Sequence, residues 1–312
     1  MEFKIELIND IEEVKKQLIF DFNEVEKEKI EIIFDFKKEK YLELEIILCI
    51  QLYYEYLTFL FAKIKKRLVI KNMDKIKDYA NAMGFLEKIP YNINKNMDYI
   101  EKIKDQYLRM EKVDFSRASF QIRELTQLIE KNIYYDKHVN REIMNSIDYI
   151  FVELFDNLMI HSKSDIGGIF SVQVFKIKKE IKIVIGDIGL GIVEVLRNAK
   201  DKQGIQKYKF ETEEEYLIRS LDENIGIQQG NGLYMLKNLV FALGGKLSIH
   251  TSKYHLTLDT ENDSINVQKT NYHKGTIFVI MLPTETSVTA EDLEIILHER
   301  PMEYDDVFGE MF

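Results

Sequence analysis

The fold is decided by the stretch Phe151–Ser162, which reads FVELFDNLMIHS. The stretch has the composition of an apolar helix, yet Glu153, Asn157 and His161 recur at every fourth position and so share one face. Buried polar groups cost free energy unless they have partners. This row of carboxylate, amide and imidazole therefore predicts either ligands for a metal-bound nucleotide or a satisfied polar seam between two domains.

Length and composition fit a globular protein with two domains of ordinary size. The chain has 312 residues, of which 46% are hydrophobic and 31% are charged. Its single cysteine, Cys49, lies in an apolar run, which excludes an internal disulfide framework and a multi-cysteine zinc site. The N-terminus alternates charges and shows no signal peptide, so we expect a cytoplasmic protein in a reducing compartment.

The net charge of −10 is unevenly distributed. Residues 286–312 contain eight Asp or Glu residues and one Arg, so they account for −7 and leave the rest of the chain near neutral. The basic cluster Lys63–Arg67 is short, and we expect no nucleic-acid partner. The apolar run Ile46–Ala62 is short for a membrane span and contains Gln51 and Glu55, so we expect a buried helix and no membrane partner.

Residues 1–90 alternate between strand-like and helix-like patterns, which predicts an α/β domain with a covered sheet. Asp10 is expected to cap the first helix, and Asp74 is expected to cap a helix that stops at Gly84. Strands are predicted at 2–8, 29–36 and 67–70, and helices at 10–20, 42–65 and 74–84.

This order resembles that of the STAS-like domains, the sulfate-transporter and anti-sigma-antagonist type. The resemblance rests on the strand that ends in Phe34–Phe36, on the long helix after it, and on Tyr79–Phe85, which reads YANAMGF. Members that act as kinase substrates carry a serine at the start of the long helix, whereas here that segment is Tyr41–Glu45 and no serine precedes Ser116. The resemblance therefore implies an interaction or dimerisation domain, and we expect a homodimer.

Two further segments are predicted between the first domain, residues 1–90, and an acidic tail at 285–312. Residues 91–117 are expected to form a linker that is partly helical between Met97 and Met110. Residues 118–284 form the second α/β domain, and Asn140 is expected to cap its central helix. Helices are predicted at 120–134 and 140–162, and strands at 170–177, 181–185, 246–250, 254–258 and 275–282.

Three glycine motifs follow the opening stretch. Residues 186–191 read GDIGLG at the end of a strand, where glycines let the backbone approach a planar ligand and Asp187 can accept a hydrogen bond from an exocyclic amine. Residues 230–233 read GNGL and open a helix, where free N–H groups and the helix dipole suit phosphate. Gly275 and Thr276 open the last strand, and residues 192–229 form a polar lid with a helix capped by Thr212.

The order and spacing of these motifs resemble the GHKL superfamily, which includes DNA gyrase, the ATP-driven heat-shock chaperones, MutL and the histidine kinases. The likeness is to the anti-sigma-factor kinases in particular, through Glu153–Asn157, His161–Ser162 and Gly244–Ser248. It covers about residues 118–284 and implies a Bergerat-type α/β sandwich with helices on one face of a mixed sheet. The chain would then be a two-domain α/β protein with ATP and Mg²⁺ as cofactors.

The resemblance implies a role for each residue at the base and metal end of the site. Asn157 would bind Mg²⁺ through its amide oxygen, a hard ligand that suits this ion. Asp187 would accept the adenine amine, and Thr276 would complete a water-linked contact to the same group. Gly189 and Gly191 would let the base lie against the strand.

The phosphate end would be formed by backbone N–H groups and three side chains of the opening stretch. Gly230, Gly232 and Leu233 would cradle the phosphates. Glu153 would be the general base that activates water, or else a structural carboxylate, and Asp156 would orient its neighbours. His161 would reach a phosphate or the ribose, or else it is a satisfied core histidine.

Two departures from the family pattern bear on activity. Asn231 stands between the two lid glycines, so the phosphate contacts are less firmly implied than the adenine contact. Only 29 residues follow Pro283, too few for the transducer domain that supplies a catalytic lysine in gyrase and MutL, so hydrolysis is expected to be slow or partner-dependent.

The function that these expectations favour is an ATP-controlled conformational switch with slow hydrolysis, acting on an unknown partner protein. One alternative is a serine/threonine protein kinase of the anti-sigma-factor type, and another is a non-hydrolysing interaction module. A histidine kinase is disfavoured, because His138 is followed by Val-Asn-Arg and not by an acidic residue. The acidic tail either docks on a partner or is a solvated end.

Overall fold

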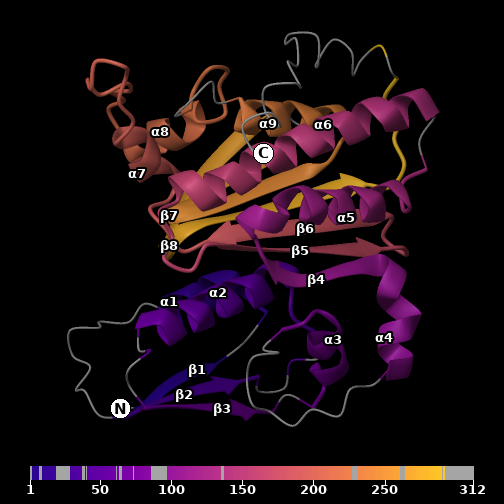
Figure 1. The fold of residues 1–312 in the computed structure, drawn as a ribbon, viewed down its shortest axis with the longest axis vertical. Helices are drawn as coiled ribbons and strands as arrows, with labels where there is room; N and C mark the ends of the chain where they lie inside the picture. Colours follow the sequence, from indigo (N-terminus) through magenta and orange to yellow (C-terminus); the bar gives the residue numbers. More distant parts are fainter. Residues whose placement is uncertain are drawn as a thin grey trace.

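The computed structural model describes residues 2–6, 9–18, 29–36, 39, 41–60, 62, 65–72, 74–85, 97–134, 137–226, 231–260, 264–289 and 291. The elements that stack on one another form four layers: a three-stranded sheet, a pair of helices, a five-stranded sheet and a second layer of helices (Figure 1). Nearly all of the acidic tail lies outside the described residues. Among the described residues, no helix is both long and apolar enough to cross a membrane.

The first half of the chain builds the two lower layers of Figure 1. Strands and helices alternate there, as predicted, and the three strands pair in parallel in the order β1-β2-β3. Asp10 caps α1 by accepting hydrogen bonds from the N–H groups of Glu12 and Glu13, which confirms that prediction. The elements are β1 (Glu2–Glu6), α1 (Ile11–Gln17), β2 (Lys29–Asp35), α2 (Leu44–Leu60), β3 (Lys65–Lys71), α3 (Lys77–Ala82) and α4 (Met97–Ile103).

The second half of the chain builds the two upper layers. All neighbouring strands of its sheet pair antiparallel, in the order β4-β5-β6-β8-β7. The elements are β4 (Tyr107–Lys112), α5 (Ala118–Glu130), α6 (Lys137–Asp156), β5 (Gly168–Phe175), β6 (Glu180–Asp187), α7 (Ile192–Arg197), α8 (Glu213–Arg219), α9 (Gly232–Ala242), β7 (Lys246–Asp259) and β8 (Ser264–Pro283).

These pairings confirm the α/β class but correct the expected mixed sheet. Strands β5 and β6 are joined by a short turn and β7 leads into β8, and such short connections can only produce antiparallel neighbours. The strands predicted at 246–250 and 254–258 are one strand, β7, and the last strand starts at Ser264, well before Gly275.

Two predicted caps and part of the predicted linker also need correction. Helix α6 begins at Lys137, so Asn140 lies inside it, and α3 follows a turn whose last residue, Ile76, takes the place expected for Asp74. Residues 107–112 are β4, an edge strand that pairs with β5 and whose Met110 N–H donates to the Met83 carbonyl. Charged side chains are common on edge strands, and here they gave the strand the composition of a linker.

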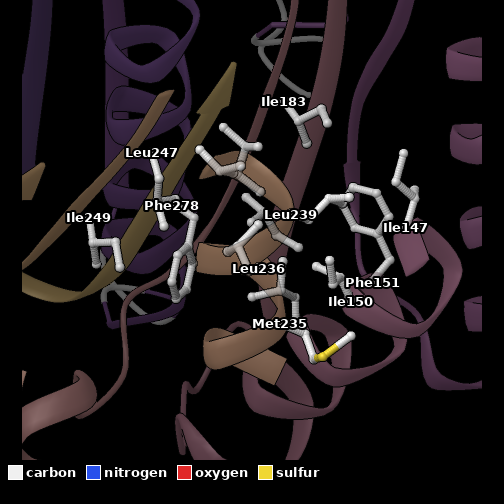
Figure 2. Packing of buried hydrophobic residues seen from close by; sticks show 14 of the residues in the cluster. Ile147, Ile150, Phe151, Ile183, Met235, Leu236, Leu239, Leu247, Ile249 and Phe278 are labelled. Atoms are coloured by element: carbon white, nitrogen blue, oxygen red, sulfur yellow. The ribbon is translucent and has the colours of Figure 1, made fainter. Parts of the chain in front are cut away.

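The upper core forms because α6 and α9 carry apolar residues at helical spacing toward the sheet. Burying one such side chain contributes about 1.5–3 kcal/mol. Figure 2 shows this packing, in which Ile147, Ile150 and Phe151 of α6 and Met235, Leu236 and Leu239 of α9 join Ile183, Leu247, Ile249 and Phe278 of the strands.

The opposite face of the five-stranded sheet is covered by helices α1 and α2 from the first half of the chain (Figure 1). On β6, Ile183 belongs to the upper core, whereas Val184 belongs to the lower one, as the two-residue period of a strand requires. Twelve of the 17 residues of α2 are buried, because this helix lies between two sheets. The helices of residues 118–284 therefore lie on one face of their sheet, as expected, and the first half of the chain covers the other face.

A buried ion pair ties α2 to the sheet. The Lys182 ammonium on β6 lies 2.6 Å from Glu43 and 3.1 Å from Glu45, next to the start of α2. Burial lowers the pKa of Lys182, but the two carboxylates outweigh this effect and hold the pKa above its ordinary value. The lysine therefore stays charged, and the contact is an ionic one.

Replacing Lys182 by Met should lower the free energy of unfolding by about 1–3 kcal/mol, because two partly buried carboxylates lose their counter-ion. Urea unfolding measures the change. The matched control is Lys179→Met, which breaks the exposed pair with Glu285 and should cost less than about 1 kcal/mol. Equal effects of the two substitutions would show that Lys182 does not hold α2 on the sheet.

Candidate functional site

The opening stretch ends in a π-helical turn, Asn157–His161, at the C-terminal end of α6. The Ser162 N–H donates to the Asn157 carbonyl across five residues at 2.8 Å, which is the bond that defines such a turn. Single π-turns inside or at the end of α-helices are frequent at functional sites. Glu153, Asn157 and His161 are all half-buried, so this row faces a partly enclosed space rather than the apolar core.

The carboxylate of Asp187 is the most unusual polar group in the second half of the chain. It lies at the end of β6, is only 3% exposed, and its Oδ1 accepts a hydrogen bond from the Gly189 N–H at 2.6 Å. Burial raises the pKa of Asp187 to about 7, although hydrogen bonds from the backbone of Gly189 and Thr276 act to lower it. A buried carboxylate with spare acceptor capacity is a candidate for ligand recognition.

Gly189 brings the end of β6 against the end of α6. A Cβ atom at this position would lie 2.0 Å from the Ser162 carbonyl oxygen and 2.9 Å from Asp187 Oδ1. The Leu190 N–H donates to the same Ser162 carbonyl at 2.7 Å. Glycine is therefore needed here for close backbone approach, and the contact joins the opening stretch to the GDIGLG motif.

Thr251 links three parts of the site that the sequence did not connect. Its hydroxyl donates to the Gly275 carbonyl at 3.0 Å, lies 3.2 Å from the Thr276 hydroxyl, and accepts a hydrogen bond from the Ile192 N–H. The predicted Thr276 is buried, as is Thr251, and Gly191 packs against the Thr251 hydroxyl. No motif signalled Thr251, because it falls between the two segments that were predicted as separate strands.

The N-terminus of α9 lies against Glu153. A Cβ atom on Gly232 would lie 2.4 Å from Glu153 Cβ and 3.1 Å from Glu153 Oε2, so the GNGL motif and the opening stretch meet directly. Leu233 is half-buried and packs on the upper core. Gly230, which the sequence also placed at this site, lies outside the described residues.

Asn231, which the sequence showed only as an interruption of the glycine pattern, sits at the N-terminal end of α9. Its side chain is fully buried, and its Oδ1 accepts a hydrogen bond from the Asn224 N–H at 2.5 Å. Its Nδ2 has no hydrogen-bond partner among the described residues. An unused donor beside the first N–H groups of a helix favours an anionic ligand at this point.

The described residues offer hard oxygen ligands at the end of α6. Burial raises the pKa of Asp156, and its Oδ1 has no hydrogen-bond partner in the described part of the chain. Within the part of the chain that the structure describes, no group of three or more His, Cys, Asp or Glu residues is arranged to hold a metal ion by itself. A Mg²⁺ ion usually keeps water and phosphate oxygens as ligands, so one amide oxygen from Asn157 fits that ion.

His161 is neutral at physiological pH. Burial lowers its pKa, and the nearby charge of Lys163 lowers it further. It can therefore contribute a hydrogen bond to a ligand but not a positive charge.

The lid is more ordered than its polar composition suggested. The Tyr208 hydroxyl accepts a hydrogen bond from the Gly226 N–H at 2.9 Å and lies 2.8 Å from the Gly226 carbonyl, which ties the middle of the segment to a residue near its C-terminal end. Phe210 packs between Tyr208 and Tyr216. Thr212 caps α8 by accepting a hydrogen bond from the Glu215 N–H, which confirms the predicted cap, and the Glu215 carboxylate accepts from the Glu211 N–H; residues 227–229 lie outside the described residues.

In comparisons with known proteins, no family model matches the sequence and no curated protein matches it significantly. Function therefore has to be inferred from the geometry of the four motifs. These lie together at one end of the five-stranded sheet, through the contacts Gly189–Ser162, Gly232–Glu153 and Gly275–Asp187.

Proposed function

We propose that the protein binds ATP with Mg²⁺ and acts as a nucleotide-controlled regulatory switch of the GHKL type. The observation that carries the proposal is the buried carboxylate of Asp187, held between the glycine-rich backbone segments at Gly189 and Gly275, while the start of α9 contacts the same helix, α6, through Glu153. A buried acceptor at one end of a site and helix N–H donors at the other match the two ends of a nucleotide.

The base end selects adenine through hydrogen bonding. A free acceptor position on the Asp187 carboxylate takes the exocyclic amine, and the Thr276 hydroxyl supports a water-linked contact to the same group. Gly189 and Gly191 let this wall pack closely on Ser162 and Thr251, which holds the backbone around the Asp187 carboxylate in place. Guanine carries an oxygen where adenine carries the amine, so the carboxylate rejects GTP.

The phosphate end uses the start of α9 and the end of α6. The N–H groups of Gly232 and Leu233 and the unused Nδ2 donor of Asn231 neutralise phosphate oxygens. Asn157 supplies an amide oxygen to Mg²⁺, which when bound neutralises phosphate charge. His161 adds a neutral hydrogen bond.

Glu153 is the residue that would accept a proton from an attacking water. It lies against the first residue of α9, where the phosphates would sit, and it is half-buried. A shift of the lid on nucleotide binding would change the surface formed by α7 and α8, which a partner protein could read. Partner binding or homodimerisation through the STAS-like half completes the proposed switch.

Asn157→Ala tests the metal end separately from the base end. Calorimetric titration of the wild type should show ATP binding that is tighter with Mg²⁺ than with EDTA, and weaker binding of GTP. Asn157→Ala should lose about ten-fold in affinity with Mg²⁺ and little with EDTA, because one charge-assisted contact is gone. A wild type that binds no ATP with or without Mg²⁺ would overturn the proposed function.

Glu153→Ala separates the switch from its alternatives. The substitution should leave ATP binding within a few-fold of wild type and reduce phosphate release by about 100-fold or more, because water loses its general base. Phosphate release is measured at saturating ATP with Asn145→Ala, a substitution elsewhere on α6, as the control. Transfer of label from γ-labelled ATP to another protein in place of phosphate release would favour the kinase alternative.

A further inference from the structure

One segment of β8, His273–Thr276, lies between the candidate nucleotide site and helix α2. On the site side, a Cβ atom on Gly275 would lie 2.3 Å from the Asp187 carbonyl oxygen, so this backbone touches the backbone of Asp187. The backbone of Thr276 also hydrogen-bonds to Asp187. The position of this segment therefore sets where the Asp187 carboxylate lies.

On its other side the same segment is held by two tyrosines of α2. The Tyr53 hydroxyl accepts a hydrogen bond from the Lys274 N–H at 3.3 Å, and the Tyr53 ring meets the His273 ring edge-on with centroids 5.8 Å apart. The Lys274 ammonium reaches the Tyr56 hydroxyl at 2.5 Å and lies 4.1 Å from the centre of that ring. Tyr53 is 5% exposed, so its hydroxyl contact is shielded from water.

Lys274 and Gly275 in the middle of the segment depend on these contacts, because the pairing with β7 skips them. Thr251 of β7 pairs with Thr276 and the next residue, Ser252, pairs with His273, so the register shifts at this segment, and Gly275 has a φ of +86°. At such irregularities the ladder of backbone hydrogen bonds is interrupted, which leaves the strand free to be set by its neighbours. Here the neighbours are α2 on one face and, within the sheet, Asp187 of β6 and Thr251 of β7.

We propose that Tyr53 is a positioning residue for the carboxylate of Asp187, acting through His273–Thr276, so that the N-terminal half of the chain sets the affinity of the nucleotide site. The statement about affinity rests on the proposed function, whereas the positioning of Asp187 does not. Because binding and positioning are linked, nucleotide at Asp187 in turn favours the conformation in which α2 holds this segment.

The test compares Tyr53→Phe with Tyr54→Phe in the full chain. The first substitution removes the hydroxyl that accepts the Lys274 N–H. The second removes a hydroxyl from the neighbouring residue, whose ring faces Phe34 of the three-stranded sheet. Two quantities are measured for each: the pKa of Asp187 in the ligand-free protein, by NMR of its carboxyl carbon, and the dissociation constant for Mg-ATP. Urea unfolding checks that both variants are folded.

Tyr53→Phe should raise the pKa of Asp187, because a displaced Thr276 N–H stabilises the carboxylate less, and should weaken Mg-ATP binding about two- to ten-fold. Tyr54→Phe should change neither. The inference is overturned if Tyr53→Phe leaves both quantities unchanged, or if Tyr54→Phe has the same effect. If Tyr53→Phe does not fold, Lys274→Met, which breaks the Tyr56 contact to the same segment, takes its place and is judged in the same way.

Failure of the proposed function gives a different result. If wild type binds no ATP, the nucleotide proposal falls, and the pKa of Asp187 in the two tyrosine variants alone decides whether Tyr53 is a positioning residue. An unchanged pKa in Tyr53→Phe then overturns the inference as well.

Discussion

Asp187→Asn is expected to abolish ATP binding while leaving the protein folded and more stable than wild type at pH 8. The Asn Oδ1 can still accept the Gly189 N–H, which in wild type lies 2.6 Å from the carboxylate. The Asn Nδ2 would then face the adenine amine, and because both groups are hydrogen-bond donors, they cannot bond to each other. The loss of a charge-assisted hydrogen bond together with an unpaired buried donor should weaken binding by about 100-fold or more.

The gain in stability follows from the pKa of Asp187. Burial raises that pKa to about 7, from an ordinary value of 3.8. Between these values the folded state holds a proton that the unfolded state has released, so the free energy of unfolding falls as pH rises from about 4 to 7. Asn does not titrate and avoids this loss, which is worth about 1–4 kcal/mol above pH 7.

Urea unfolding at pH 8 and pH 5, with calorimetry for ATP, measures both effects. The difference in stability between Asp187→Asn and wild type should shrink as the pH falls to 5. Asp165→Asn is the matched control, because Asp165 is exposed, and it should change neither quantity. Retained ATP binding in Asp187→Asn would remove Asp187 from the site, and a less stable variant would show that the ionised carboxylate is structurally required.

Acidification from pH 7.5 to pH 5 is expected to weaken the contact between α1 and the five-stranded sheet. His250 and His255 of β7 stack with ring centroids 4.1 Å apart, and His273 of β8 is fully buried nearby. These rings face Glu12 and the buried Lys15 of α1. Two stacked imidazoles beside a lysine cannot both accept protons without repulsion.

The sign of the effect follows from the histidine pKa values. Burial lowers the pKa of His273 to about 3 and that of His255 to about 4, and it lowers the pKa of His250 as well. The unfolded state takes up these protons near pH 6.5 and the folded state does not, so stability is lost as pH falls below about 7. For His273 alone the loss at pH 5 is about 2 kcal/mol.

Glu12 affects the free energy of unfolding at a lower pH than the histidines do. Burial raises its pKa, but His250 and Lys15 outweigh burial and hold it at about 2, so its contribution is lost only below about pH 4.5. Between pH 7 and 4, a fall in pH raises the free energy of unfolding through Asp187 and lowers it through the histidines. The full loss of stability that the histidines cause should therefore be seen in the Asp187→Asn background.

In that background, His273→Phe should remove about 2 kcal/mol of the fall in unfolding free energy between pH 7.5 and 5. The pH dependence is compared, not the absolute stability, so any packing cost of the substitution cancels. Hydrogen exchange of the α1 amides at both pH values locates the opening. An unchanged pH dependence in His273→Phe would assign the acid sensitivity to other groups.

Local features were predictable from the sequence. Asp10 and Thr212 cap helices as their spacing indicated, and the hairpin of β5 and β6 follows from alternating residues. The motifs of the candidate site were visible in the sequence, and close contacts at Gly189 and Gly232 bring them together in space, while the nucleotide-binding roles of their residues stay predictions. Caps and hairpins depend on residues that are close together in the chain, and the contacts between motifs depend on glycines that allow close approach of the backbone.

Features that depend on distant partners were not predictable. His250 and His255 are five residues apart, and an unbroken strand would point them to opposite faces; the irregular register between them turns both to the same side. The role of Lys182 depends on α2, which lies far away in the sequence. Thr251 and Asn231 gained significance only from what surrounds them in the fold.

The shared layer of α1 and α2 also makes the two halves of the chain inseparable. The sheet that carries the candidate site has no solvent-facing side, since Ile169, Val184, Ile277 and Val279 are covered by the first half of the chain. Cleavage or deletion of that half would bare a continuous hydrophobic surface beneath the site. The first half of the chain thus supports the site from the opposite face of the sheet, and a structural change in that half would affect the binding of a ligand at the site.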